Sequence, residues 1–190
     1  MRAGPLDWQR LPGDPRILLE LRLLRAGAAE AVRSGEPVQA VARRYGIETK
    51  VVSEILVREA VMHSGALHSV WDGEPVHAAL NRLGIEPASE GLDLARLLLE
   101  RSAANGVAAT AVRAGEDVGV VAERSDILTA YGVAALEYAA LIQDNHQLVQ
   151  QLADGEGANA VASEWGIETG YNKSRLAALA DHPNPPAPAA

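Results

Sequence analysis

The chain has 190 residues, a hydrophobic content of 48% and a formal net charge of −8. It contains no cysteine, which excludes a disulfide framework and thiolate chemistry. No uncharged apolar run reaches the roughly 18 residues that a membrane-spanning helix needs, and residues 1–7 do not have the pattern of a signal peptide. We therefore expect a cytoplasmic protein with no membrane partner.

The apolar residues are mostly small or aliphatic. Ala, Leu and Val dominate, Phe is absent and aromatic residues make up 4% of the chain. Ala and Leu favour helices, and small side chains let helices approach closely. No alternating run of β-branched residues is long enough to indicate a sheet. The composition therefore predicts an all-α protein.

A short phrase recurs four times along the chain. It reads Ser-Gly-Glu-Pro-Val at residues 34–38, and its glycine, Gly35, returns as Gly73, Gly115 and Gly155. In the first copy a second glycine, Gly46, lies between this phrase and the next predicted helix. Self-similarity at a regular period predicts one supersecondary unit repeated in tandem. We expect four helix-turn-helix-like repeats of about 40 residues, packed as one helical array.

In chain order, residues 1–14 are expected to form a flexible lead-in, because Gly and Pro are frequent there. Asp14 and Pro15 are typical of a helix start, and Gly35 is placed to end that helix. A proline-rich segment at 183–190 is expected to be a disordered tail. Between these ends, the pattern predicts helices over residues 15–34 and 37–45, one from 48 to a break at 63–65, one that ends at residue 72, and helices over 75–83, 87–102, 107–114, 117–124, 130–151, 157–165 and 169–180.

Charge is distributed unevenly. Residues 1–63 hold 10 Lys/Arg and 8 Asp/Glu, whereas residues 64–190 hold 7 and 17. The first repeat, residues 15–63, is therefore the only electrostatically plausible contact for nucleic acid. We expect residues 64–182 to form three degenerate, acidic helix-turn-helix-like units that suit a basic partner.

The first repeat contains every element of a DNA-binding helix-turn-helix. Ala42 is the small residue of the first helix, Gly46 lies in the turn, and Ile47, Val52 and Ile55 are placed to dock the second helix. In this register several polar and basic side chains face outward, where they can contact base edges or phosphates. The predicted DNA-contacting residues are Arg33, Arg43, Arg44, Thr49, Lys50 and Ser53.

The later copies depart from this pattern. Glu90 and Asp93 match Val52 and Ile55 in the second copy, Gly132 matches Val52 in the third, and Asn172 does so in the fourth. These copies are predicted to keep the shape of the unit without groove reading. The alternative is that all four units form a protein-contact scaffold, since helical hairpins also serve as packing units in helical arrays.

The third repeat resembles a known family. Its turn Arg113-Ala114-Gly115-Glu116, its Leu128-Thr129 helix start and its ending over residues 134–140, Ala-Ala-Leu-Glu-Tyr-Ala-Ala, are similar to the homeodomain-like helix-turn-helix of small VapB-type antitoxins. The first repeat resembles the same family and other bacterial regulators. In each repeat the resemblance covers a short motif and not the whole chain. It implies a helical DNA-binding unit, DNA autoregulation and neutralisation of a basic ribonuclease toxin.

The sequence offers little that is typical of an active site. His63, His68 and His77 would have to converge, for example with Asp72, to hold a metal ion. No phosphate-binding glycine loop occurs, and the scattered carboxylates are expected to lie on solvated helix faces and caps. We therefore predict that the protein is not an enzyme and uses no metal or cofactor.

Two hypotheses about function follow. The first is a DNA-binding transcription regulator, in which the first unit contacts double-stranded DNA and a homodimer spans two half-sites. The second is a protein-interaction scaffold or antitoxin-like neutraliser that does not bind DNA, in which the acidic repeats hold a basic partner protein.

Overall fold

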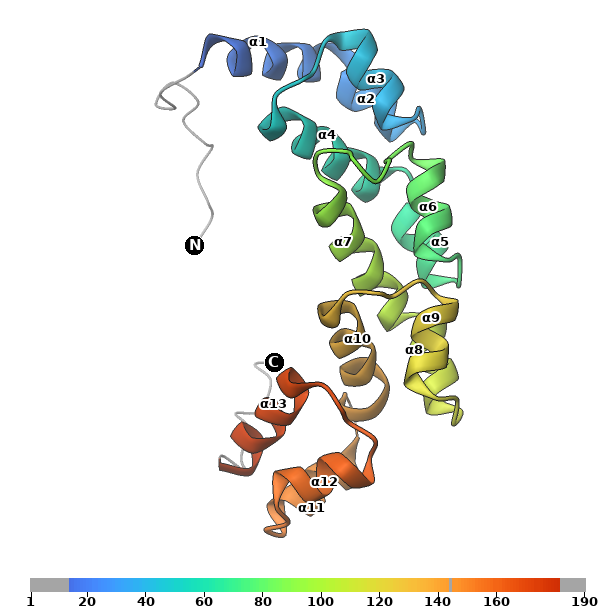
Figure 1. Ribbon diagram of the computed structural model, residues 1–190, viewed down its shortest axis with the longest axis vertical. Coiled ribbons are helices and arrows are strands. Elements are labelled where there is room, and N and C mark those ends of the chain that lie inside the picture. The colour runs from blue at the N-terminus through green and yellow to red at the C-terminus, as the bar shows by residue number, and fades with distance from the viewer. Residues whose placement is uncertain (1–13, 144, 182–190) are drawn as a thin grey trace, which may run out of the picture. The chain divides into compact units, whose positions relative to one another are not determined.

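A computed structural model describes residues 14–143 and 145–181 (Figure 1). The described residues are helices joined by turns, without a strand, so the predicted all-α class is confirmed. They divide into two compact units. Unit 1 comprises residues 1–64 and 81–95, and unit 2 comprises residues 65–80 and 96–190. The predicted tail over 183–190, and the predicted lead-in apart from Asp14, lie outside the described residues.

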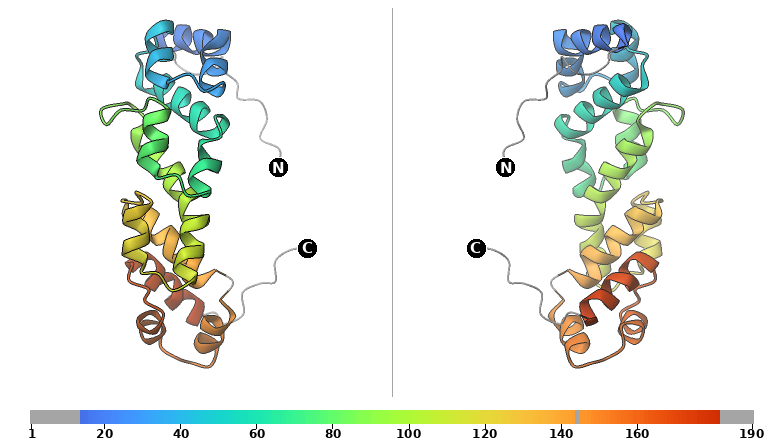
Figure 2. Two further views of the ribbon diagram at one scale, coloured as in Figure 1. Left: turned by 90° about the vertical axis from the view of Figure 1, so that its right-hand side faces the viewer. Right: turned by 90° about the vertical axis from the view of Figure 1, so that its left-hand side faces the viewer.

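The helices follow one another with short connections, which Figure 2 shows from two further sides. Each linking helix is followed by a short helix and then a longer one, and this order recurs. That these sets of helices pack as one array stays a prediction. In chain order the helical segments are α1 (Pro15–Leu23), the π-type segment η2 (Leu24–Ala28), α2 (Ala29–Arg33), α3 (Val38–Tyr45), α4 (Lys50–His63), α5 (Ala66–Trp71), α6 (Val76–Arg82), α7 (Leu92–Asn105), α8 (Val107–Arg113), α9 (Val118–Arg124), α10 (Ala130–Glu137), the π-type segment η3 (Tyr138–Ile142), α11 (His146–Ala153), α12 (Ala158–Glu164) and α13 (Gly170–Asp181).

The recurring glycines end the linking helices, as predicted for Gly35. Gly35, Gly73, Gly115 and Gly155 have φ angles of 96°, 108°, 99° and 91°, a left-handed conformation in which glycine has no Cβ to strain. In each case the following backbone N–H donates to a carbonyl of the last helical turn, as Glu36 does to Ala31 at 3.0 Å. This satisfies carbonyls that the helix end would otherwise leave unpaired.

Three predicted helices differ from those observed. The helix predicted over 15–34 is interrupted at Gly27, whose φ of 151° is not helical. The helix predicted over 130–151 breaks at Gln143, which is extended with a ψ of 127°. The helix predicted from residue 87 begins at Leu92, because residues 87–91 form a loop.

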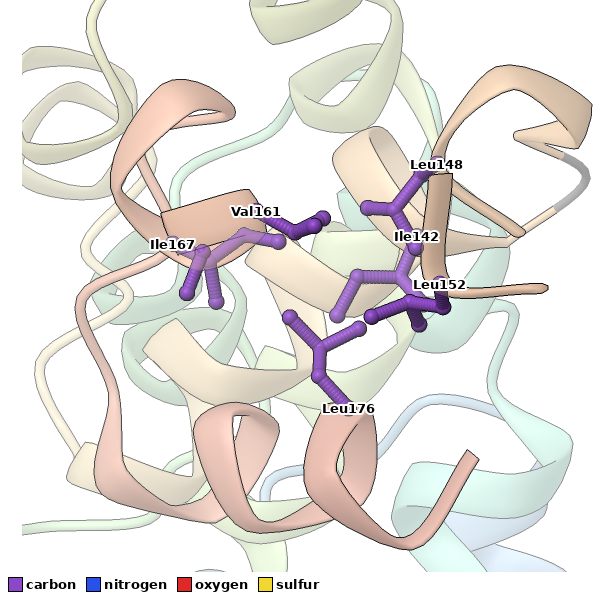
Figure 3. Packing of buried hydrophobic residues seen from close by; sticks show 7 residues of the cluster. Ile142, Leu148, Leu152, Val161, Ile167 and Leu176 are labelled. Carbon is purple, nitrogen blue, oxygen red and sulfur yellow. The ribbon is translucent and has the colours of Figure 1, made fainter. Parts of the chain in front are cut away.

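The core of unit 2 includes a tight aliphatic cluster near its C-terminal helices. Leu176 of α13 points toward Ile142 of η3, Leu148 and Leu152 of α11, and Val161 of α12 (Figure 3). Each of these side chains is at most 5% exposed. Burying a large aliphatic side chain stabilises a fold by about 1.5–3 kcal/mol. The cluster therefore fixes α13 on α11 and α12, which positions the N-terminal half of α13 described below.

Candidate functional site

The hairpin of α3 and α4 has the local geometry predicted for the first repeat. Gly46 ends α3 with a left-handed φ of 66°. At the start of the same repeat, Asp14 caps α1 by accepting a hydrogen bond from the Arg16 N–H at 2.9 Å. Ile47, which follows the turn, is 4% exposed, and Val52 of α4 is fully buried. Since these residues hold the two helices together, the outer face of α4 is defined by the remaining positions.

Most of the basic side chains predicted to contact DNA lie beside carboxylates. Arg33 is 2.6 Å from Glu59, and Arg44 is 2.7 Å from Glu36, measured between nitrogen and carboxylate oxygen. The Glu36 contact also raises the pKa of Arg44, chiefly through the hydrogen bond to its guanidinium. These arginines are about half exposed, and their charge is locally neutralised.

Lys50 and Arg43 differ from one another. The Lys50 ammonium is 69% exposed and lies 3.9 Å from both Glu54 and Glu90. Arg43 is exposed and has no ion pair among the described residues. Of the four basic residues predicted to contact phosphate, Arg43 alone therefore keeps an uncompensated charge in the part of the chain that is described.

The two hydroxyl residues of the predicted site are in different surroundings. The Thr49 hydroxyl donates to Glu20 at 2.6 Å, and its backbone N–H donates to the same carboxylate at 3.0 Å. Ser53 is half-buried and lines a hollow of about 320 Å³ together with Ala88 and Ser89. Thr49 is therefore engaged within unit 1, and Ser53 faces a loop of the same unit.

That loop, residues 87–91, contacts the hairpin at several points. The Gln39 amide donates to the Ser89 hydroxyl at 2.6 Å, and Glu90 approaches Lys50. A Cβ on Gly91 would lie 3.2 Å from the Val57 side chain, so this backbone is closely packed on α4. The loop therefore covers part of the α4 face that the sequence predicted to be open.

The loop also changes the charge of the hairpin's surroundings. With residues 81–95 included, unit 1 holds 11 Lys/Arg and 11 Asp/Glu, whereas unit 2 holds 6 and 14. The excess of +2 over residues 1–63 is therefore cancelled within unit 1, and the formal net charge of −8 belongs to unit 2. A neutral unit attracts a polyanion weakly.

A contact that the sequence analysis did not anticipate recurs in both units. Glu20, Glu100 and Glu137 are at most 2% exposed, although such carboxylates were expected on solvated helix faces. Each accepts hydrogen bonds from both the backbone N–H and the hydroxyl of a threonine that begins a longer helix. We call this contact the glutamate clasp, and its pairs are Glu20–Thr49, Glu100–Thr129 and Glu137–Thr169.

The clasp satisfies backbone donors that a helix start leaves unpaired. In the third pair, Glu137 accepts from the N–H groups of Glu168 and Thr169 at 3.0 and 3.1 Å and from the Thr169 hydroxyl at 2.6 Å. A buried carboxylate is tolerated when it accepts several hydrogen bonds. The clasp thus attaches the start of a longer helix to a helix that precedes it in the chain.

One position lacks the clasp. Val57 in α4 follows a buried leucine, as Glu100 and Glu137 do in α7 and α10, but it packs against Gly91 instead of a threonine. The turn sequence Ile-x-Thr, present at residues 47–49, 127–129 and 167–169, reads Ile-Glu-Pro at residues 85–87. The glutamate and the threonine are therefore absent together, and an apolar contact replaces them.

The residues that made the later repeats look degenerate accommodate this contact. Gly132 leaves room for Glu100, because a Cβ there would collide with its carboxylate and lie 2.8 Å from Ile127. Asn172 is fully buried and donates to Glu137 and to the Ala134 carbonyl, each at 2.9 Å. In the second repeat, Glu90 and Asp93 were wrongly matched to the docking positions Val52 and Ile55. The loop at residues 87–91 delays the start of α7 to Leu92, so the residues of α7 are shifted relative to those of α4.

The glutamate clasp predicts a pH dependence for unit 1. Burial alone would raise the pKa of Glu20, but the hydrogen bonds from Thr49, from the Glu48 N–H and from Arg16 outweigh it and hold the pKa below its usual range. The usual value is about 4.3. Since the native state then binds fewer protons than the unfolded state, the stabilisation is complete above that pH and is lost as pH falls through the native pKa.

We expect Glu20→Gln to reduce the loss of stability on acidification. The measurement is urea denaturation of both proteins, followed by circular dichroism, between pH 7 and pH 3. Glu48→Gln is the matched control, because Glu48 is 71% exposed although it also pairs with Arg16. Equal acid sensitivity of all three proteins would contradict the assigned role of Glu20.

Other expectations concern metals and membranes. No group of three His, Asp or Glu side chains that could hold a metal ion occurs in the described ranges. His63, His68 and His77 each lie beside a different carboxylate: Glu59, Asp72 and Asp126. None of the described helices is both long and apolar enough to cross a membrane.

Comparison with known proteins gives no relative. No family model matches the chain, and neither the curated proteins nor the solved structures contain a match to it. The resemblance to antitoxin-type helix-turn-helix units stays a prediction.

Proposed function

We propose that this chain is an interaction protein whose acidic unit 2 binds a basic partner protein, as a scaffold or an antitoxin-like neutraliser would. The observation that carries the proposal is the separation of charge between the two units. Unit 2 holds 14 Asp/Glu against 6 Lys/Arg, and unit 1 is neutral. Concentrated charge of one sign steers a partner of the opposite sign and speeds its association.

Several carboxylates of unit 2 are available to a partner. Glu123, Glu156 and Glu168 are exposed, and their side chains have no ion pair or hydrogen bond among the described residues. Large apolar side chains are exposed in the same unit, with Val120 at 57% and Leu128 at 63%. Apolar groups mixed with charge are typical of protein interfaces.

DNA binding by unit 1, through a homodimer, is the second candidate. It is favoured by the exposed Arg43, which has no ion pair among the described residues, and by the hairpin geometry of α3 and α4. It is weakened by the carboxylates beside Arg33, Arg44 and Lys50. A regulator normally uses several uncompensated cations to hold the phosphate backbone.

The test compares two triple variants of the full-length chain. Glu123→Lys/Glu156→Lys/Glu168→Lys reverses free charges of unit 2. The tagged wild-type protein is crosslinked in its native cells, the basic partner is identified by mass spectrometry, and its affinity is then measured with purified proteins. We expect the unit 2 variant to bind at least ten-fold more weakly than the wild type and the wild-type affinity to fall with added salt.

The control variant is Arg43→Ala/Arg44→Ala/Lys50→Ala, which is expected to bind the same partner unchanged. Both variants must show the wild-type circular dichroism spectrum. Equal affinity of the unit 2 variant and the wild type would reject the proposal. Retardation of genomic fragments at low salt by the wild type, lost in the unit 1 variant, would favour DNA binding instead.

A further inference from the structure

A hollow on unit 2 gathers aromatic and cationic side chains that the proposed function does not use. Its volume is about 260 Å³, and the side chains that line it come mainly from α7, α10, η3 and α13. Three of the four tyrosines of the chain line it, together with two arginines. Arg101, Tyr131, Tyr138, Tyr171 and Arg175 are these side chains, and two amide side chains, described below, also line the hollow.

Two of these tyrosines present their rings to solvent. Tyr131 of α10 is 49% exposed and Tyr171 of α13 is 61% exposed. Each lies two residues after a clasp threonine, Thr129 or Thr169, so they occupy equivalent positions on successive longer helices. Exposed aromatic rings beside a hollow are typical of ligand sites, and they offer flat faces for stacking.

The two arginines are those of unit 2 that lack a polar partner for the guanidinium group among the described residues. Arg96 and Arg124 pair with carboxylates, and Arg113 donates to the Ala139 carbonyl. Arg101 and Arg175 are exposed and have no carboxylate partner among the described residues. In a unit that carries more than twice as many acids as bases, two uncompensated guanidinium groups at one hollow favour an anionic ligand.

Arg175 is already oriented by the aromatic cluster. Its guanidinium carbon lies 4.1 Å from the centre of the Tyr138 ring and 6.0 Å from that of Tyr171. A guanidinium stacked on a ring keeps its N–H groups in its own plane, where they can donate to a phosphate in a bidentate manner. Stacking therefore restricts Arg175 without occupying its donors.

The hollow also contains side-chain amides. Asn105 of α7 donates one N–H to the Arg101 carbonyl at 2.7 Å, and its amide oxygen remains an acceptor. Gln143, which follows η3, lines the same hollow and is exposed. Amide side chains present a donor and an acceptor that match the edges of nucleobases.

We propose that this hollow binds a nucleoside monophosphate. The base stacks on Tyr131 or Tyr171, its edge meets the amides, and the phosphate contacts Arg101 and Arg175. The volume falls just below the range of about 300–1,000 Å³ for drug-sized ligands, so the hollow has room for about one nucleotide. A polynucleotide is also disfavoured by the acidic charge of unit 2. The site is independent of the partner binding proposed above.

The test is isothermal titration calorimetry of the full-length chain with AMP, GMP, CMP and UMP. We expect at least one of these nucleotides to bind. The nucleoside with the same base, and inorganic phosphate, are each expected to bind at least ten-fold more weakly than that nucleotide. Arg175→Gln is expected to weaken binding at least ten-fold and Tyr171→Leu at least five-fold. Lys173→Gln, which removes a charge from the same helix outside the hollow, is expected to leave the affinity unchanged.

Several results would overturn this proposal. One is that none of the four nucleotides binds at millimolar concentration. Another is that inorganic phosphate, or the nucleoside, binds as tightly as the nucleotide does. A phosphotyrosine peptide that binds more tightly than every nucleotide would also overturn it, in favour of a peptide site. Thermal melts of the variants matched to the wild type ensure that lost binding is not lost folding. None of these results bears on the acidic partner surface.

Discussion

Glu137→Ala is expected to lower the free energy of unfolding of unit 2 by about 3–5 kcal/mol. The Glu137 carboxylate accepts hydrogen bonds from Glu168, Thr169 and Asn172, and it is 2% exposed. Alanine leaves these donors without an acceptor and opens a cavity between α10 and α13. Whole domains are stable by only about 5–15 kcal/mol. Urea denaturation followed by circular dichroism and by the fluorescence of Trp71 and Trp165 measures the loss.

Two variants show whether the loss comes from the clasp. Glu123→Ala removes an exposed carboxylate from α9 and is expected to leave stability almost unchanged. Glu137→Gln keeps the shape of the side chain but replaces one acceptor oxygen by an NH₂ donor. Because that donor would face other donors, we expect a loss of stability between those of the other two variants. If Glu137→Ala were as stable as Glu123→Ala, the clasp would contribute nothing to the packing of α13.

Val57→Glu is expected to destabilise unit 1 by a similar amount, about 3–5 kcal/mol, although the same residue type is native at the equivalent positions of α7 and α10. Val57 is 1% exposed and packs on the backbone of Gly91. The local turn reads Ile85-Glu86-Pro87, so neither a threonine hydroxyl nor a threonine N–H is present to donate a hydrogen bond to the carboxylate. The change would bury a charge without partners. Hydrogen exchange of the α4 amides measures the effect on this unit directly.

Val51→Glu is the matched control for that variant. It makes the same replacement on the same helix at a side chain that is 51% exposed, and exchange of the α4 amides is expected to stay close to that of the wild type. Equal protection of α4 in both variants would mean that the loop at residues 87–91 is not firmly packed on Val57. The charge added is identical, so only burial distinguishes the two proteins.

Local signals in the sequence were sufficient for much of the helical pattern. The glycines at 35, 73, 115 and 155 end helices because only a left-handed residue allows the last carbonyls to be paired there. Asp14 with Pro15 marks a helix start for equally local reasons. Gly46 was recognised as the hairpin turn on the same basis.

Interactions between distant residues were missed. A glutamate on a helix is normally solvated, and nothing near Glu20, Glu100 or Glu137 in the sequence shows that a threonine far along the chain will cover it. The signal that was available is the repeated Ile-x-Thr turn, which changes to Ile-Glu-Pro in the one copy where the glutamate is a valine. Reading both features together would have indicated their contact.

The carboxylates around the candidate DNA face were missed for a related reason. Arg33, Arg44 and Lys50 were identified from their outward register, and they are indeed exposed. Arg33 lies beside Glu59 of α4, and Arg44 lies beside Glu36, which precedes α3. Lys50 lies near Glu90 of the loop at residues 87–91, a segment that was expected to be helical. The hollow of unit 2 was also missed, because its tyrosines and arginines come from the separate segments α7, α10, η3 and α13.

The glutamate clasp also bears on how genes for such chains gain or lose length. A duplication or deletion with ends at matching points of α7 and α10 would again bring a glutamate to an Ile-x-Thr turn. The glutamate and the threonine at the new junction would then form the clasp without further substitution. An event with one end in α4 would instead join Val57 to a threonine turn and provide neither an acceptor nor a close fit. Growth by whole repeats is therefore easier in the C-terminal part of the chain than across α4.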